Sequence, residues 1–405
     1  MPTTSKQLFT RLRQAVTGAG TAIRCTTRLQ PAGGPGDKIF PPTYRDDRNH
    51  TVYATEERLI DGEIVPCVLL DSVQSQANRL EQALLTAIEL EALPFPLLAT
   101  DVNGHGRVTV LEVPHRLYDA IFRDSTLDGT SFRQSTLGQQ LLSARPQQAT
   151  ALYQHCPQVL LLGGWDAHGG DAGRGARIGR ALTSEIIGVQ TTPGVRPASR
   201  HDPLGITLSA GPIYRAAAPE LWTLDPGIAT QDKGKTQRYG DGNPSSIGHS
   251  SVTPSLELGG VTLREARQIA VLSLPALRRL RFPDLATGAV DAACDAAGRV
   301  VLAALAVYVL ALQVVQGFDL RSRCVLVPSE PPQVEIVGPI ATACQAFSLD
   351  VASARAVLQQ ALRQAETLGL RWDTGLIVLQ AQAKLTTLVR RSQATADGTV
   401  EGGQA

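Results

Sequence analysis

The chain has 405 residues, of which 43% are hydrophobic and 19% are charged. This profile is typical of a globular protein and excludes collagen-like, disulfide-dense and wholly disordered chains. The 38 basic residues nearly balance the 37 acidic ones, which by itself argues against a nucleic-acid partner. Only five of the basic residues are lysines, however, and arginine suits bidentate contacts with phosphate and stacking on bases. A GC-rich genome that favours arginine codons would explain the same bias.

The six cysteines are scattered, and the N-terminus lacks the apolar core of a secretory signal. We therefore expect a reducing, cytoplasmic setting and no metal or redox motif built on cysteine. Residues 300–315 are apolar except for Gln313. This run is shorter than the roughly 20 residues that a spanning helix needs, so we expect a buried core helix and no membrane partner.

In the first half of the chain, strands are predicted over 21–29 and 64–70. A helix capped by Asp71 or Ser72 follows from Val73, because apolar residues recur there at helical spacing. Next come a strand over 108–113, short helices up to about residue 154 and a short buried strand over 159–162. Six glycines between 163 and 175 predict a loop, with a helix beginning near Ala176.

Residues 189–263 are rich in Gly, Pro, Ser and Thr, which predicts an irregular, functional or partly disordered region. After it we expect a strand over 268–274, a short helix beginning at Pro275, a long helix over 285–316 and strands over 324–327 and 334–337. Helices over 352–368 and 376–390 close the fold, and the polar tail over 392–405 is expected to be disordered. Strands and helices mix without strict alternation, which favours an α+β fold.

Three basic clusters are candidate nucleic-acid contacts. Arg174, Arg177 and Arg180 follow the glycine loop at intervals of three. In the predicted helix, Arg177 and Arg180 share a stripe with Ser184, and a glycine loop that leads into a helix N-terminus suits a phosphate. A solvated charged face is the alternative. The other clusters are Lys233, Lys235 and Arg238, and Arg278, Arg279 and Arg281, with Trp165, Tyr214, Trp222 and Tyr239 nearby in sequence to stack on bases.

The segment WDAHGGD at 165–171 offers a different chemistry. Asp166, His168 and Asp171 could hold a divalent ion that activates water for phosphodiester cleavage. The alternative is a glycine-rich loop whose polar side chains form turns or touch a ligand, and the lack of a second acidic cluster at a familiar spacing favours it.

The segment DSVQSQANRLE at Asp71–Glu81 resembles a motif of the RAMP-superfamily backbone subunit of type I-G (formerly I-U) CRISPR Cascade complexes, the Cas-seven role. Other segments agree in the same order: FPPTY at 40–44, YATEE at 53–57, WDAHGG at 165–170, RALTSEIIGV at 180–189, HDPLGI at 201–206, NPSSIGHSSVTPS at 243–255 and VLSLPALRRLRFP at 271–283. The likeness runs from about residue 20 to about 330. The chain departs from the family pattern at Ser246 and Ser250, on either side of His249.

This resemblance implies a non-enzymatic subunit without a cofactor. It implies an RRM-like, ferredoxin-like palm over 20–330 with large insertions, of which 163–263 is a glycine-rich finger or thumb region, followed by a mainly helical part over 331–391. Copies would polymerise head to tail along CRISPR RNA, beside a large subunit and a guide-processing subunit, and would present the guide to target DNA. The residues expected to contact RNA are Ser75, Gln76, Asn78, Arg79, Trp165, His168, Arg174, Arg177, Arg180, Lys233, Lys235 and Arg238.

Overall fold

The computed structural model describes residues 4–91, 93–166, 177–340 and 343–396. The chain divides into two units. The first comprises Met1–Thr191 and Leu263–Thr386, and the second comprises Thr192–Thr262 and Thr387–Ala405. The larger segment of the second unit is therefore inserted into the first, and its boundaries fall within two long strands, β12 (Leu182–Arg200) and β17 (Val252–Ser273).

The main sheet of the first unit has the strand order β18-β19-β1-β17-β12-β5-β4, with β20 also paired to β1 and β21 paired to β20. Strand β1 is antiparallel to β17, β19 and β20. The bounds not yet given are β1 Ala22–Pro31, β4 Thr55–Ile60, β5 Glu63–Asp71, β18 Phe318–Arg321, β19 Cys324–Pro328, β20 Gln333–Val337 and β21 Cys344–Phe347.

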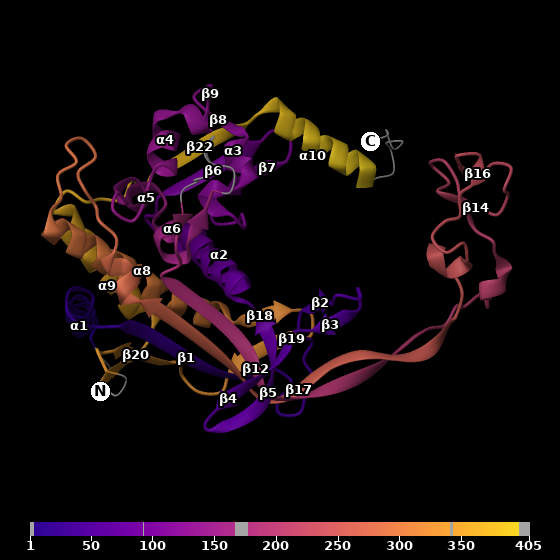
Figure 1. Ribbon diagram of the computed structural model, residues 1–405, viewed down its shortest axis with the longest axis horizontal. Coiled ribbons are helices and arrows are strands. Elements are labelled where there is room, and N and C mark those ends of the chain that lie inside the picture. Colours follow the sequence, from indigo (N-terminus) through magenta and orange to yellow (C-terminus); the bar gives the residue numbers. More distant parts are fainter. Residues whose placement is uncertain (1–3, 92, 167–176, 341–342, 397–405) are drawn as a thin grey trace. The chain divides into compact units, whose positions relative to one another are not determined.

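Helices α2 (Val73–Glu91) and α8 (Ala292–Gln316) pack on one face of this sheet (Figure 1). The palm consists of β1, α2, β12, β17, α8 and β19 in chain order. Within the sheet, its four strands lie in the order β19-β1-β17-β12. This βαββαβ order, with the fourth and third strands flanking the first, is the ferredoxin-like arrangement. The predicted α+β fold with an RRM-like palm is confirmed.

Helix α8 forms the centre of the hydrophobic core. Its residues from Val300 to Leu312 are all buried, and it packs against α1 (Ser5–Thr17), α2 and α9 (Val351–Glu366). By length and composition α8 could span a membrane, but 83% of its most apolar window is buried inside the protein. The prediction of a buried core helix is confirmed.

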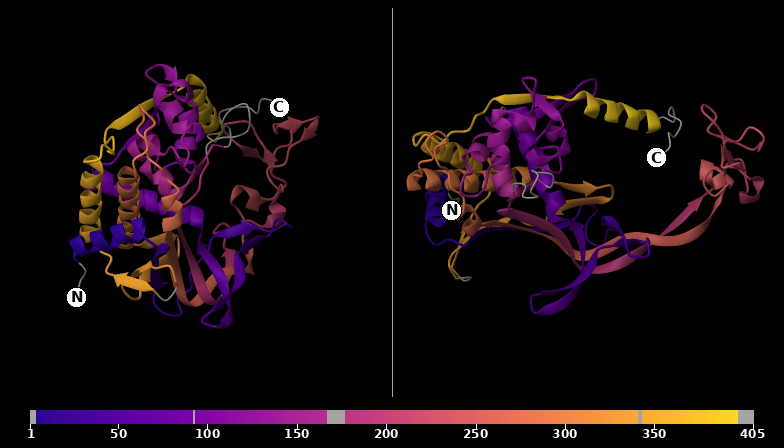
Figure 2. Two further views of the ribbon diagram at one scale, coloured as in Figure 1. Left: turned by 60° about the vertical axis from the view of Figure 1, so that its left-hand side comes forward. Right: turned by 45° about the horizontal axis from the view of Figure 1, so that its top comes forward.

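A second, smaller sheet has the order β7-β6-β22-β8-β9, with β22 parallel to β6. Figures 1 and 2 show it on the other side of α2 from the main sheet. Short helices surround it and lead back towards the palm. The bounds are β6 Leu97–Val102, β7 Gly106–Thr109, β8 Ser125–Leu127, β9 Thr130–Ser131, β22 Leu376–Ala381, α3 Ala120–Arg123, α4 Thr136–Leu142, α5 Thr150–His155 and α6 Pro157–Leu162.

Several predicted elements differ from the structure. The strand expected over 108–113 is β7, which ends at Thr109, so residues 110–113 lie outside it. The long helix expected over 285–316 begins only at Ala292. Residues 159–162 belong to helix α6, since a short apolar run buried on every side has no periodicity to separate strand from helix. The helix expected near Ala176 is replaced by β11 (Arg177–Ile178). Residues 189–200 and 252–263 lie in β12 and β17 instead of an irregular region. The helix expected over 376–390 is split into strand β22 and helix α10 (Ala383–Ala396).

Candidate functional site

A short β-hairpin carries the most exposed aromatic group of the candidate site. Strand β10 (Gly164–Trp165) pairs with β11, so that Trp165 lies directly opposite Arg177. Directly opposed residues project from the same side of a hairpin. The Arg177 guanidinium carbon is 5.4 Å from the centroid of the Trp165 ring, within the range of a cation–π contact, and Trp165 is 57% exposed. The predicted contacts His168 and Arg174, together with Asp171, lie outside the described residues.

Two glycines fix where this hairpin leaves the core. Gly163 has a φ of 81°, and a Cβ there would lie 2.8 Å from Cγ of Arg180. A Cβ on Gly164 would lie 2.4 Å from the ring of Tyr118, which is buried. Because only a glycine lets the backbone approach that closely, the sequence GGW sets the hairpin against Tyr118 and directs Trp165 outward.

The hairpin forms one wall of a hollow of about 340 Å³, named here the Trp165 hollow. Its lining consists of Pro114, His115, Arg116, Gly163, Gly164, Trp165, Arg177, Ile178, Gly179 and Arg180. Nε of Arg180 donates to the carbonyl of Leu162 at 3.1 Å, which directs the guanidinium along the wall. Among the described residues, the terminal nitrogens of Arg180 and the whole guanidinium of Arg177 have no hydrogen bond or ion pair. The hollow therefore combines a stacking surface with free cationic donors.

A buried ion pair supports the inner wall of the Trp165 hollow. Arg116 donates to both carboxylate oxygens of Glu81, at 2.6 and 2.8 Å, and to the carbonyl of Gly163 at 3.4 Å. Burial raises the pKa of Glu81 to about 7, while the charge and hydrogen bonds of Arg116 oppose that rise. Burial and the charge of Arg116 lower the pKa of Arg180. Sequence reasoning missed Arg116 because it lies about 50 residues before the hairpin, in a segment with no basic cluster.

Of the three residues considered for metal binding, only Asp166 lies within the described part of the chain. Asp166 is 3% exposed, and both of its oxygens accept hydrogen bonds from Arg133, at 2.9 and 2.7 Å. Within the described ranges, no group of three His, Cys, Asp or Glu side chains could hold a metal ion. Asp166 thus anchors the hairpin to the 3₁₀ turn at Phe132–Gln134.

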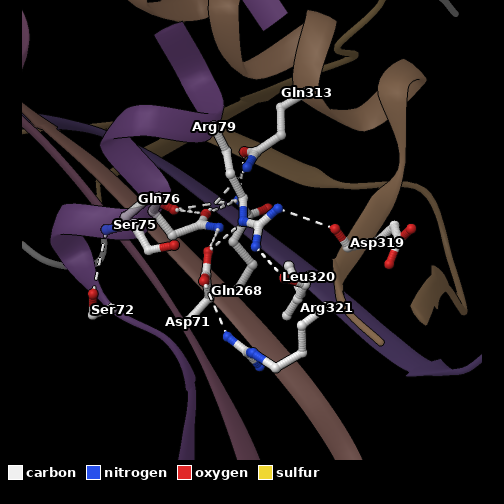
Figure 3. A network of polar contacts seen from close by, with 11 residues as sticks. Asp71, Ser72, Ser75, Gln76, Arg79, Gln268, Gln313, Asp319, Leu320 and Arg321 are labelled. Atoms are coloured by element: carbon white, nitrogen blue, oxygen red, sulfur yellow. Dashed lines mark hydrogen bonds and ion pairs between the residues drawn. The ribbon is translucent and has the colours of Figure 1, made fainter. Parts of the chain in front are cut away.

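Gln76, on the resembling motif, lies at the centre of a buried polar network (Figure 3). Its amide nitrogen donates to Asp71 at 2.6 Å. Its amide oxygen accepts from Ser184 at 2.8 Å, from Gln268 at 2.9 Å and from Gln313 at 3.3 Å. These partners come from β5, β12, β17 and α8, so the network joins the palm strands to both palm helices. Ser184 is therefore buried in β12, and the predicted helical stripe that it would share with Arg177 and Arg180 is not formed.

Arg79, one turn further along α2, donates hydrogen bonds to three other residues of the protein (Figure 3). Its Nε donates to Asp71 at 2.9 Å, and its two terminal nitrogens donate to the carbonyls of Asp319 and Leu320. The second Asp71 oxygen lies 3.6 Å from Arg321. Arg79 therefore ties α2 to β18. Its predicted contact with RNA is not tested by these bonds.

Ser75 and Asn78 are two further predicted contacts on the same motif. Asn78 is exposed and Ser75 is half-buried, and they are three residues apart on α2, so they share one face. The backbone N–H of Ser75 donates to Oγ of Ser72, which confirms Ser72 as a cap of this helix. Their contact with RNA stays a prediction.

In the second unit, the predicted cluster Lys233, Lys235 and Arg238 is exposed. Strands β15 (Gln231–Asp232) and β16 (Lys235–Thr236) form a hairpin around Lys233 and Gly234, whose φ angles are 51° and 75°. Positive φ at both central residues is the type I′ turn that matches strand twist. The hairpin therefore presents both lysines to solvent.

The second unit also brings together two of the resembling segments that were not assigned a site. Asp202 accepts a hydrogen bond from the backbone N–H of Ser250 at 2.7 Å, and Nδ1 of His249 lies 3.9 Å from the same oxygen. His249 meets the ring of Trp222 edge to face, with 6.5 Å between centroids. The collinear motifs HDPLGI and GHSS were the only signal in the sequence for this contact.

The third basic cluster is used in part for folding. Arg278 donates to the carbonyls of Gly18 and Gly20, at 2.9 and 2.6 Å, just after α1 ends. Arg281 lies 3.6 Å from the buried carboxylate of Asp295, while Arg279 is exposed. A cation at a helix C-terminus satisfies free carbonyls, so part of this cluster stabilises α1.

The fold and site define a class: an α+β protein with an RRM-like palm and a cationic, aromatic hollow beside it. Residues 23–193 match the family described as CRISPR-associated protein GSU0053. The match spans less than half of the 405 residues and indicates a CRISPR-associated protein family. It includes the palm motif and the whole wall of the Trp165 hollow, whereas the resembling segments from residue 201 onward lie beyond it. No curated protein matches the chain.

Proposed function

We propose that this protein is the CRISPR RNA-binding backbone subunit of a type I-G Cascade complex, a RAMP-superfamily protein of the cytoplasm without catalytic activity of its own. Copies would assemble head to tail along the guide RNA, with the large subunit and the guide-processing subunit as further partners. The guide so held would pair with target DNA. The match to a CRISPR-associated family and the RRM-like palm both support this proposal.

The Trp165 hollow is the observation that carries the proposal. Guide sequences differ from one spacer to the next, so a backbone subunit must hold the strand without reading its bases. An aromatic face stacks on any base, and arginines with free terminal nitrogens bind phosphates, so Trp165, Arg177 and Arg180 suit such a strand. The exposed lysines of the second unit and the Ser75–Asn78 face of α2 offer further sequence-independent contacts.

The proposal is tested with the double variant Arg177→Ala Arg180→Ala and single-stranded RNAs of unrelated sequence. Binding should weaken for every sequence alike. The slope of log affinity against log salt should become shallower by about 1.4, since each phosphate contact to a single strand contributes about 0.7. The matched control is Arg107→Ala Arg371→Ala, which removes two exposed arginines that lie outside the Trp165 hollow and outside the three basic clusters, and it should leave the slope unchanged. If Arg177→Ala Arg180→Ala binds RNA with the affinity and salt slope of the wild type, the proposal is wrong.

Incubation of the purified protein with single-stranded RNA and Mg²⁺ or Mn²⁺ tests the absence of catalysis. We expect binding without cleavage. Metal-dependent cleavage that disappears in His168→Ala would instead favour a phosphodiesterase built on Asp166, His168 and Asp171.

A further inference from the structure

An exposed apolar pair stands at the tip of the β4–β5 hairpin. Leu59 and Ile64 lie directly opposite each other and are 73% and 70% exposed. Glu57 and Pro66, the next opposed pair on the same side, are exposed as well. Two large aliphatic side chains side by side on a protruding hairpin, with a carboxylate beside them, form a patch that is apolar at the centre and acidic at its rim.

The other side of the same hairpin is covered. Ile60 and Val65 pack against a small cluster formed by Cys67, Ile187 and Val189. At the tip, Asp61 and Gly62 have φ angles of 54° and 87°, the type I′ geometry of a tight turn, so the register is fixed. The fold thus determines that Leu59 and Ile64 face outward, because a slip of one residue would exchange the two sides.

A hollow of about 320 Å³ lies elsewhere in the first unit, between α1, α8 and α9, and is named here the alanine hollow. Ala293, Ala296, Ala297 and Val300 of α8 form its floor. Arg13 of α1 is exposed at its rim and is the one charged residue in the described lining. In the described part of the chain, neither Arg13 nor Glu57 forms an ion pair. The alanine hollow is therefore apolar at the centre and basic at its rim.

We infer that the alanine hollow receives the β4–β5 hairpin tip of a second copy of this chain. Leu59 and Ile64 would pack on the alanines of α8, and Glu57 would pair with Arg13. Shape and charge agree: a convex aliphatic pair with an acidic rim meets a concave aliphatic floor with a basic rim. The two surfaces are different parts of one unit, so the contact is heterologous and leaves a free hairpin at one end and a free hollow at the other.

This inference rests on the proposed function, because such an open-ended contact suits copies that line up along an RNA. The test is the size of assemblies on a long single-stranded RNA of mixed sequence, measured by sedimentation velocity. Each full-length variant is also titrated with a short RNA that holds one copy, which reports RNA binding alone.

The charge-reversed variants Glu57→Arg and Arg13→Glu should each weaken assembly on long RNA by on the order of tenfold or more, because like charges would meet at the rim. An equimolar mixture of the two variants should assemble like the wild type, since every contact in the mixture can again join opposite charges. The matched control Glu63→Arg makes the same charge change on the covered side of the hairpin and should leave assembly unchanged. Leu59→Ser Ile64→Ser should reduce assembly without reducing short-RNA binding.

Two results would overturn the inference and leave the proposed function standing. One is that the Glu57→Arg and the Leu59→Ser Ile64→Ser proteins both form assemblies of wild-type size on long RNA. This holds even if the two variants no longer co-purify with another subunit, because the hairpin would then bind that subunit and not a second copy. The other is failure of the mixture to recover while the single variants still bind short RNA. Absence of short-RNA binding in the wild-type protein would instead defeat the proposed function itself.

Discussion

Glu81 and Arg116 form a bidentate ion pair beside the Trp165 hollow, with side chains that are only 1% and 5% exposed. Arg116 holds this position with a φ of 53°, an uncommon backbone conformation for a residue other than glycine. The same guanidinium reaches the carbonyl of Gly163, where the β10–β11 hairpin begins. Helix α2 and the candidate RNA surface are thereby joined through one buried pair.

Glu81→Ala should lower the free energy of unfolding by about 3–5 kcal/mol, because it leaves the Arg116 guanidinium buried without its partner. Chemical denaturation measures this loss. Glu89→Ala, an exposed position on the same helix, should change stability by less than about 0.5 kcal/mol. Equal effects of the two substitutions would contradict a structural role for the pair.

Arg79→Lys should lower the free energy of unfolding by about 1–3 kcal/mol, although it keeps the positive charge. A lysine ammonium cannot bond Asp71 and the carbonyls of Asp319 and Leu320 at once in the directions that the guanidinium fork provides. Hydrogen exchange should show faster exchange in β18 of the variant. If stability and exchange in β18 stay at their wild-type values, the link between α2 and β18 is not formed through Arg79.

Trp165→Ala should weaken binding of single-stranded RNA by about 1–3 kcal/mol, the usual contribution of one stacked base, while Trp165→Phe keeps most of the affinity. Since Trp165 is more than half exposed, neither change should alter the unfolding midpoint much. Fluorescence anisotropy of labelled RNA measures the affinities. A loss in the phenylalanine variant as large as in the alanine variant would argue against stacking.

Asp124 should make stability depend on pH in the acid range. Hydrogen bonds from Arg123 and Lys384 lower the pKa of Asp124 to about 2 in the folded protein, below its ordinary value of 3.8. A lowered pKa means that the folded state favours the ionised carboxylate, so the stabilisation is complete above about pH 4 and is lost as the pH falls to about 2.

The variant Asp124→Asn should therefore be less stable than the wild type by about 1 kcal/mol at neutral pH, since Lys384 and Arg123 are partly solvated, and equally stable near pH 2. Urea denaturation at several pH values measures the difference. A difference that does not change between pH 6 and pH 2 would exclude ionisation of Asp124 as its cause.

The sequence by itself determined the elements whose hydrophobic pattern has one clear period. It predicted the strand that starts near Ala22, the helix from Val73, and the apolar segment that became α8, because one-sided or continuous apolar runs must be buried. It also pointed to the GGW segment and to Arg177 and Arg180, since glycines beside arginines are visible without knowing any contact. The α+β class followed from the mixture of these elements.

Only the tertiary structure decided how the candidate residues are used. Residues 157–162 form helix α6, and because all of them are buried, their apolar run has no periodicity that separates a helix from a strand. Arg177 meets Trp165 through strand pairing across a gap of 11 intervening residues, not along a helix. Gln76 and Arg79 make internal contacts with partners more than 100 residues away, and Arg116 joins the site from another segment. Local spacing cannot encode such contacts, because they form only when distant strands and helices pack against one another.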